Sequence, residues 1–285
     1  MKPLLFALLF SPLLNATELK NRQAHFYKNL RPLSSQRIVS LAPVATEIIT
    51  ALGLSDRLVG ITRFCKKPST KTIALIGGYI DPQLEAIIAL KPDLVIAMPS
   101  MGVQKIVDQL HKKAIPTLIG FGDTLAEIRN LIDFIGTSTK KSAEAQRALQ
   151  RFDLTLSKLR PLKATTPKRS VLVVVGNNPI VVAGHNTFID EIIALMGFKS
   201  AVPAESLPWP TWSLEAVLAH SPEIIVNIQG PEALAQLTKD LQPILAHPKI
   251  RQTKIIAPPH PLLQSAGISL ADEALLLKNL IEQAL

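Results

Sequence analysis

One segment of the chain occurs twice, 130 positions apart. Residues 83–97 read QLEAIIALKPDLVIA and residues 213–227 read SLEAVLAHSPEIIVN, and the two copies share Leu, Glu, Ala, Ala and Pro. In each copy, apolar residues at helical spacing precede a Pro-Asp or Pro-Glu pair, and an apolar run rich in β-branched residues follows. This pattern predicts a helix, a turn and a buried strand. The duplication predicts two lobes of similar structure.

Predicted strands and helices alternate along both lobes. Because this alternation is typical of parallel strands covered by helices on both faces, we expect an α/β fold with mostly parallel sheets. We place the N-terminal lobe at 37–137 and the C-terminal lobe at 164–285. Between them, residues 138–163 carry apolar side chains at spacings of 4, 3, 4 and 3 from Ala145 to Leu159. This spacing predicts a single long helix that joins the lobes and restricts their relative motion.

Residues 1–16 have the features of a secretory signal peptide. Lys2 precedes the apolar run PLLFALLFSPLL, and the small residue Ala16 provides a cleavage point. The run is too short to span a bilayer. We therefore expect a soluble exported protein, located in the periplasm of a Gram-negative cell, without membrane insertion after cleavage. Residues 17–36 are polar, and we expect them to form a loosely ordered arm.

Charge and cysteine content narrow the function classes. The net charge is +9, but the excess cations lie on the N-terminal tail and on residues 138–168. No basic face with interleaved aromatic residues results, so nucleic acid is not an expected partner. Cys65 is the single cysteine, which excludes an intrachain disulfide and a cysteine-rich metal site. We expect Cys65 to act as a small buried hydrophobic residue.

The common catalytic motifs are absent from the sequence. It contains no G-x-G-x-x-G, no phosphate-binding G-x-x-x-x-G-K-[ST], no G-x-S-x-G and no H-E-x-x-H. The six histidines are never paired at i, i+2 or i, i+4, so the sequence has no local metal-binding pattern. Asp81 and Glu85 could form a glycosidase-like carboxylate pair, but helix capping explains Asp81 more simply. We assign no catalytic residue, metal ligand or cofactor.

The few aromatic residues are the best candidates for ligand contacts. Tyr79 and Trp209 occupy matched positions, each in a loop before one copy of the repeat. In α/β sheets such loops lie at the edge that binds ligands, and two rings suit a flat, largely apolar ligand. The alternative is that both rings only cover the starts of their helices. Phe64 is a weaker candidate, and Trp212 is expected to pack at the first turn of its helix.

Glu85 and Glu215 also occupy matched positions in the two copies. If Asp81 and Thr211 are the N-caps, each Glu is the fourth helical residue. There it would favour the positive helix end by less than about 1 kcal/mol. Alternatively, the two carboxylates are matched contacts for a partner, where charge complementarity sets orientation. The residues alone favour the helix-end explanation.

Three stretches together resemble a known family. RIVSLAPVATEIITALGLSDRLVGITRFCKKP, GGYIDPQLEAIIALKPDLVIA and LPWPTWSLEAVLAHSPEIIV occur in this order. They resemble the substrate-binding proteins of ABC importers for cobalamin, ferric siderophores and haem. The resemblance covers nearly all of residues 37–285. It implies a class III periplasmic binding protein fold, with two lobes joined by one rigid helix, a ligand between them and slight closure on binding.

The resemblance also implies the partner. Glu85 and Glu215 match two acidic residues of the family, one on each lobe, that dock into arginine pockets of a dimeric permease in the inner membrane. This favours partner binding over the helix-end explanation. The receptor itself is expected to be a monomer.

Within the family, Trp209-Pro210 is most similar to the cobalamin receptors. There, aromatic residues matching Phe64, Tyr79 and Trp209 surround the corrin. Where these receptors have an Asp and an Arg in the last cleft loop, this chain has the region of His260 and Gln264. Val181 stands near the place of another aromatic residue.

We therefore expect a corrinoid ligand, cobalamin or cobinamide. The alternative is haem or a ferric siderophore, since haem receptors of similar fold use a Tyr near Tyr79 as an iron ligand. We rank a zinc or manganese receptor and a periplasmic enzyme below both.

Overall fold

The computed structural model describes residues 22–68, 72–100, 102–160 and 168–285. The predicted signal peptide, the first residues of the arm and the end of the predicted connecting helix lie outside these ranges. The chain forms two compact units of strands and helices, so the expected α/β class is confirmed. The N-terminal unit extends to Arg151 and also includes Ser265–Ile268. The C-terminal unit comprises Phe152–Gln264 and Ser269–Leu285.

The sheet of the N-terminal unit has six strands in the order β1-β6-β5-β2-β3-β4. All neighbours pair in parallel except β1 with β6. The central strands β2 and β5 are entirely buried, as expected for apolar runs in a sheet covered on both faces. The strands are β1 (His25–Phe26), β2 (Ile38–Ser40), β3 (Leu58–Ile61), β4 (Ala74–Leu75), β5 (Leu94–Ala97) and β6 (Thr117–Ile119).

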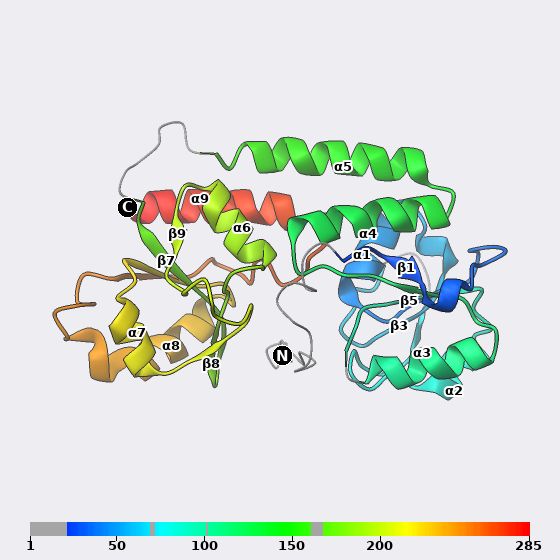
Figure 1. The fold of residues 1–285 in the computed structure, drawn as a ribbon, viewed down its shortest axis with the longest axis horizontal. Helices are drawn as coiled ribbons and strands as arrows, with labels where there is room; N and C mark the ends of the chain where they lie inside the picture. Colours follow the sequence, from blue (N-terminus) through cyan, green and yellow to red (C-terminus); the bar gives the residue numbers. More distant parts are fainter. Residues whose placement is uncertain (1–21, 69–71, 101, 161–167) are drawn as a thin grey trace. The chain divides into compact units, whose positions relative to one another are not determined.

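Helices cover both faces of this sheet. Helices α1 and α4 lie on one face, and α2 and α3 lie on the other (Figure 1). Side chains from α2 and α3 share a core with buried residues of β2 and β5. The helices are α1 (Pro43–Ala51), α2 (Leu84–Ala89), α3 (Val103–Lys112) and α4 (Leu125–Ser138).

The described part of the arm, residues 22–36, is an integral part of the N-terminal unit and not a loose extension. Strand β1 pairs with β6 in antiparallel orientation. Arg22 Nε lies 2.9 Å from a carboxylate oxygen of Glu127, whose side chain is fully buried, and the Arg22 guanidinium also pairs with Asp123. The same guanidinium lies 4.5 Å from the ring centroid of Phe121. For residues 22–36 the expectation of a loosely ordered arm was wrong, because the partners that hold them are about a hundred residues away in sequence.

The sheet of the C-terminal unit is mixed. Its main order is β10-β8-β7-β11-β12, with β9 also paired to β7. The pairs β7–β11, β11–β12 and β7–β9 are parallel, whereas β8 is antiparallel to both β7 and β10. The strands are β7 (Ser170–Asn177), β8 (Ile180–Val182), β9 (Lys199–Ser200), β10 (Thr211–Trp212), β11 (Ile224–Asn227) and β12 (Lys254–Ile256).

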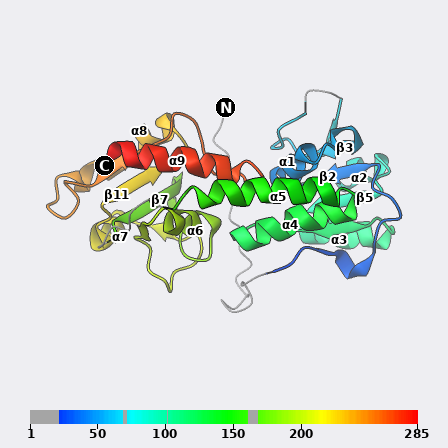
Figure 2. The ribbon, with the colours of Figure 1, turned by 90° about the horizontal axis from the view of Figure 1, so that it is seen from above.

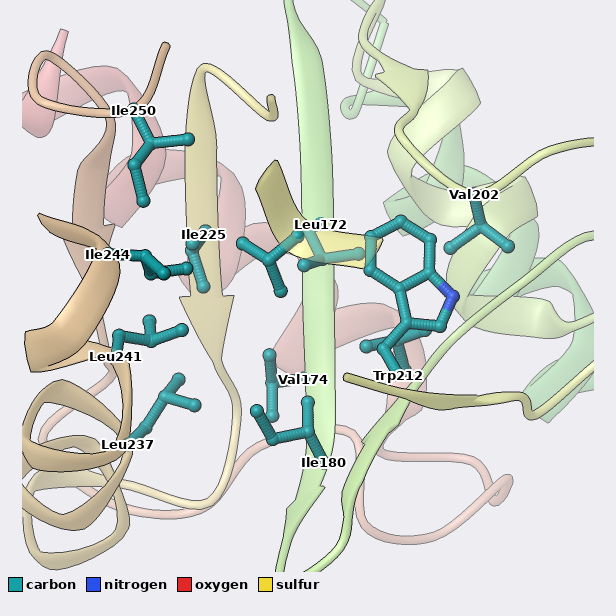
Figure 3. Packing of buried hydrophobic residues seen from close by; sticks show 12 residues of the cluster. Leu172, Val174, Ile180, Val202, Trp212, Ile225, Leu237, Leu241, Ile244 and Ile250 are labelled. Carbon is teal, nitrogen blue, oxygen red and sulfur yellow. The ribbon is translucent and has the colours of Figure 1, made fainter. Parts of the chain in front are cut away.

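Four helices cover the second sheet. Helices α7 and α8 lie on one face, and α6 and α9 lie on the other (Figure 1). Residues of α7 and α8 join Leu172, Val174 and Ile225 of the sheet in one apolar cluster, into which Trp212 also inserts (Figure 3). The helices are α6 (Phe188–Leu195), α7 (Leu214–His220), α8 (Pro231–Leu245) and α9 (Leu270–Ala284).

Helix α5 (Ser142–Ser157) carries the chain from one unit to the other. It is shorter than predicted, because α4 ends at Ser138 and Lys140 adopts a left-handed conformation with φ of 60°. Figure 2 shows α5 as an unbroken helix beside α4, and Gln146 donates a hydrogen bond of 2.8 Å to Asp133 across the two helices. Among the described helices, none is long and apolar enough to cross a membrane.

Candidate functional site

The two copies of the repeat fold in the same way. In α2 and α7 the shared Glu is exposed and the third apolar position, Ile87 or Val217, is buried. After each helix, Lys91 and Ser221 adopt left-handed conformations at matched positions. The strands that follow, β5 and β11, are buried along their whole length. The duplicated sequence therefore places an equivalent helix start and an equivalent buried strand in each unit.

The predicted N-caps of these helices were wrong. The caps are Gln83 and Ser213, not Asp81 and Thr211, because Pro82 and Trp212 keep the preceding backbone out of the helix. Ser213 caps through its side chain, whose oxygen accepts from the Ala216 N–H at 3.3 Å. The shared Glu is thus the second helical residue of each copy, inside the first turn.

Glu85 and Glu215 are both solvent-exposed at these helix starts. Neither forms an ion pair among the described residues. A hydrogen bond from the Ser213 side chain and one from the Glu215 backbone lower the pKa of Glu215, which keeps this carboxylate charged at neutral pH. Each copy of the repeat therefore presents an exposed carboxylate at the start of its helix, an arrangement suited to contact with a cationic partner.

Tyr79 lies in the loop between β4 and α2 and is half-buried. Its hydroxyl donates to the Pro99 carbonyl at 3.4 Å. Burial raises the pKa of Tyr79 to about 12, with a smaller contribution from the negative charge of Asp123. The side chain therefore stays a neutral phenol throughout the physiological range.

This state of Tyr79 can be measured by titration. The chain has two tyrosines, so Tyr27→Phe leaves Tyr79 as the single phenol. In that variant, phenolate absorbance should appear with a midpoint near pH 12, about two units above an exposed tyrosine. Adding Asp123→Asn should lower the midpoint, because it removes a nearby negative charge. A midpoint near 10 in Tyr27→Phe would contradict the described environment.

Phe64 lies in the loop after β3 and is 38% exposed. The guanidinium carbon of Arg63 lies 5.0 Å from its ring centroid. The neighbouring Cys65 is buried, with its sulfur 3.1 Å from the Thr62 hydroxyl. The prediction of a buried cysteine is confirmed. The sequence did not indicate a role for Arg63, apart from its position next to Phe64.

In the C-terminal unit, the segment that follows Trp209 pairs with strand β8, which carries Val181. Val181 faces Thr211 across the β8–β10 pair, and the Val182 N–H donates to the Pro210 carbonyl at 3.0 Å. Trp209 is only 7% exposed and packs edge-on against Phe188, with ring centroids 6.2 Å apart. The sequence did not indicate Phe188 as a neighbour, because it lies on a separate element, helix α6.

His260 and Gln264 lie on the segment between β12 and α9. His260 is exposed, and the Gln264 side-chain amide donates to the Leu262 carbonyl at 3.3 Å. The segment is held to the sheet by the Leu262 N–H, which donates to the Ile228 carbonyl at 3.0 Å. Both side chains are therefore on a loop anchored beside the end of β11. Within the described ranges, no group of three or more His, Cys, Asp or Glu residues is arranged to hold a metal ion.

Comparison with known proteins gives a consistent result. The family model described as periplasmic binding protein matches residues 38–257. A vitamin B12-binding protein of Pectobacterium carotovorum is 29% identical over 218 residues, which cover 75% of this chain and 79% of the relative. The vitamin B12-binding protein of Vibrio campbellii is 31% identical over 192 residues, covering 67% and 70%.

Solved structures agree in fold. The periplasmic haem-binding protein of Roseiflexus sp. RS-1 superposes with a TM-score of 0.75 at 27% identity, covering 88% of this chain and 99% of that one. The periplasmic vitamin B12-binding protein of Vibrio cholerae gives a TM-score of 0.72 at 24% identity, covering 87% and 97%. Proteins named for two different ligands thus share this architecture.

Proposed function

Because this chain belongs to the periplasmic binding protein family, we propose that it is a receptor that captures a corrinoid, cobalamin or cobinamide, and delivers it to an ABC importer. Members of the family are binding proteins and not enzymes, which confirms that part of the prediction. They take a small-molecule ligand and work with an ABC transporter. The identity of the ligand as a corrinoid is our proposal.

The observation that carries this proposal is the likeness to vitamin B12-binding proteins. It extends over 218 residues of this chain for the first relative and 192 for the second. It is supported by the Trp209-Pro210 pair before the second copy of the repeat. In this proposal Phe64, Tyr79 and Trp209 contact the corrin, and Pro210 and Val181 form its apolar surroundings. His260 and Gln264 supply polar contacts. That both units contribute to one ligand site stays a prediction.

Haem is the second candidate, because the Roseiflexus neighbour is a haem-binding protein at 27% identity. If this chain binds haem, Tyr79 is the candidate iron ligand. Iron(III) binds a tyrosine in its phenolate form. Burial raises the pKa of Tyr79 to about 12, which disfavours the phenolate form while no metal ion is bound. We therefore rank haem after the corrinoid.

We further propose that the receptor works as a monomer in the periplasm after removal of residues 1–16. Glu85 and Glu215 then dock to the two halves of a permease dimer in the inner membrane. The exposure and matched placement of the two carboxylates support this assignment.

Titration of the purified protein with cobalamin, cobinamide and haemin tests the ligand. We expect a corrinoid to bind with Kd below about 10 μM, which corresponds to roughly −7 kcal/mol. Calorimetry gives the affinity, and visible absorption reports the environment of the bound metal. If none of the three binds at that level, the proposal fails. If haemin binds with a tyrosinate-type spectrum that disappears in Tyr79→Phe, haem replaces the corrinoid.

A further inference from the structure

We propose that Arg63 is a positioning residue that fixes Phe64 and the Tyr79 loop as one ligand-binding face, through its stacking on Phe64 and its ion pair with Asp81. This inference rests on the proposed function, since it concerns the same aromatic residues. Arg63 contacts Phe64 and, through Asp81, the loop that carries Tyr79. No contact between Arg63 and the ligand is required.

The backbone brings the two loops together first. Beyond the paired strands β3 and β4, the Ile76 N–H donates to the Ile61 carbonyl at 3.0 Å, and the Arg63 N–H donates to the Gly77 carbonyl at 2.9 Å. The parallel pairing thus continues to the point where each strand turns into its loop. Because carboxyl ends of parallel strands meet at one edge, the Phe64 loop and the Tyr79 loop start side by side.

The guanidinium of Arg63 then connects the loops through side chains. One terminal nitrogen donates to both carboxylate oxygens of Asp81, at 3.0 and 3.1 Å. Its central carbon lies 5.0 Å from the Phe64 ring centroid, within the range of a cation–π contact. A single side chain therefore contacts the ring of one loop and the carboxylate of the other. A lysine could supply the charge but not the planar group that stacks and pairs at once.

The Tyr79 loop is shaped to receive this pair. A Cβ atom at Gly78 would lie 2.1 Å from an oxygen of Asp81 and 2.6 Å from the terminal nitrogen of Arg63. The ion pair thus covers the backbone directly before Tyr79. Gly77, with φ of 97°, closes the turn in a conformation that favours glycine, and the Gly78 N–H reaches the Asp81 carbonyl at 3.4 Å. The backbone that carries Tyr79 is therefore held between the turn and the ion pair.

A role in global stability does not account for the pair. The side chains of Arg63 and Asp81 are 51% and 57% exposed, and ion pairs of this exposure contribute little to folding. The pair instead holds the exposed Phe64 ring and the loop 77–82 in one geometry before the ligand binds. This raises the affinity, because ordering these groups on binding would cost free energy. The expected effect of the pair is thus on affinity.

The test uses Arg63→Gln, Asp81→Asn and the double variant. Each single variant should weaken corrinoid binding about tenfold, with the apparent melting temperature nearly unchanged. The double variant should be no weaker than either single one, because the two residues act as a unit. Arg63→Lys should restore only part of the affinity. Affinity is measured by calorimetry with cobalamin and cobinamide, and stability by thermal unfolding.

The matched control is Lys28→Gln. Lys28 and Asp108 form a pair of similar exposure, 57% and 42%, in the same unit but on η1 (Tyr27–Asn29) and α3. The Lys28→Gln variant removes one positive charge, as Arg63→Gln does, and should leave the affinity for corrinoids unchanged. If the Arg63 variants bind corrinoids as tightly as the unchanged protein, the inference fails and the proposed function stands. If Lys28→Gln weakens binding equally, a general charge effect replaces the inference. If the unchanged protein binds no corrinoid, the proposed function fails instead.

Discussion

Replacing Glu85 and Glu215 together by alanine should abolish import of the ligand while leaving its affinity for the purified receptor unchanged. Each carboxylate is exposed in the first turn of a short helix, one helix in each unit. Such charges on rigid elements orient a complex and speed its formation. We expect import to fall to the background level in the double variant, and only in part in each single variant. Uptake of radiolabelled ligand by cells or by permease-containing vesicles measures the effect.

Two other acidic residues provide the control for this experiment. Asp56 and Glu232 are exposed in the N-terminal and C-terminal unit, and Glu232 also lies in the first turn of a helix. The double variant Asp56→Ala with Glu232→Ala removes the same charge and should import normally. The helix-end explanation predicts another result, in which Glu85→Ala and Glu215→Ala each lose a little stability and import continues. A loss of ligand affinity in the Glu variants would also contradict docking.

The repeat was predictable because its information is local. The positions of Glu85, Ile87 and the strand after Pro92 follow from spacing within fifteen residues, and the second copy repeats the pattern. The caps were missed for a local reason too, since Asp81 is a typical capping residue but Pro82 leads into an extended segment. In that case the backbone geometry outweighed the side-chain preference.

The misses elsewhere are contacts between distant segments. In the sequence Arg22 is one residue of a polar arm. In the structure it pairs with the buried carboxylate of Glu127, 105 residues later. A buried carboxylate requires a partner, so the arm must pack on the unit. The sequence likewise did not predict the ion pair of Arg63 with Asp81 or the contact of Trp209 with Phe188. No periodicity encodes these pairs, because each depends on how loops and helices meet after folding.

The sequence predicts different roles for the two tryptophans, a ligand contact for Trp209 and local packing for Trp212, but their exposed fractions are the same. Both are 7% exposed. Trp212 inserts among Leu172, Val174 and Val202 of the apolar cluster (Figure 3), and its ring lies 5.0 Å from that of His220. Trp209 instead packs at its edge against Phe188. The surroundings therefore assign Trp212 to the core, where it lies on β10 with its ring against the end of α7 and not at the first turn of that helix as predicted. A contact between Trp209 and the ligand stays a prediction.

Trp212→Ala should lower the free energy of unfolding of the C-terminal unit by about 3–5 kcal/mol, because it leaves a large cavity in a close-packed cluster. Denaturant unfolding followed by circular dichroism measures this change, with the two units fitted as separate transitions. Trp212→Phe fills most of the cavity and should bind corrinoid normally, whereas Trp209→Phe should lose about tenfold in affinity through poorer stacking. If Trp212→Ala lowers the free energy of unfolding by less than about 1 kcal/mol, the stabilising role of Trp212 in the core is contradicted. Equal affinities for the two phenylalanine variants would contradict a contact between Trp209 and the ligand.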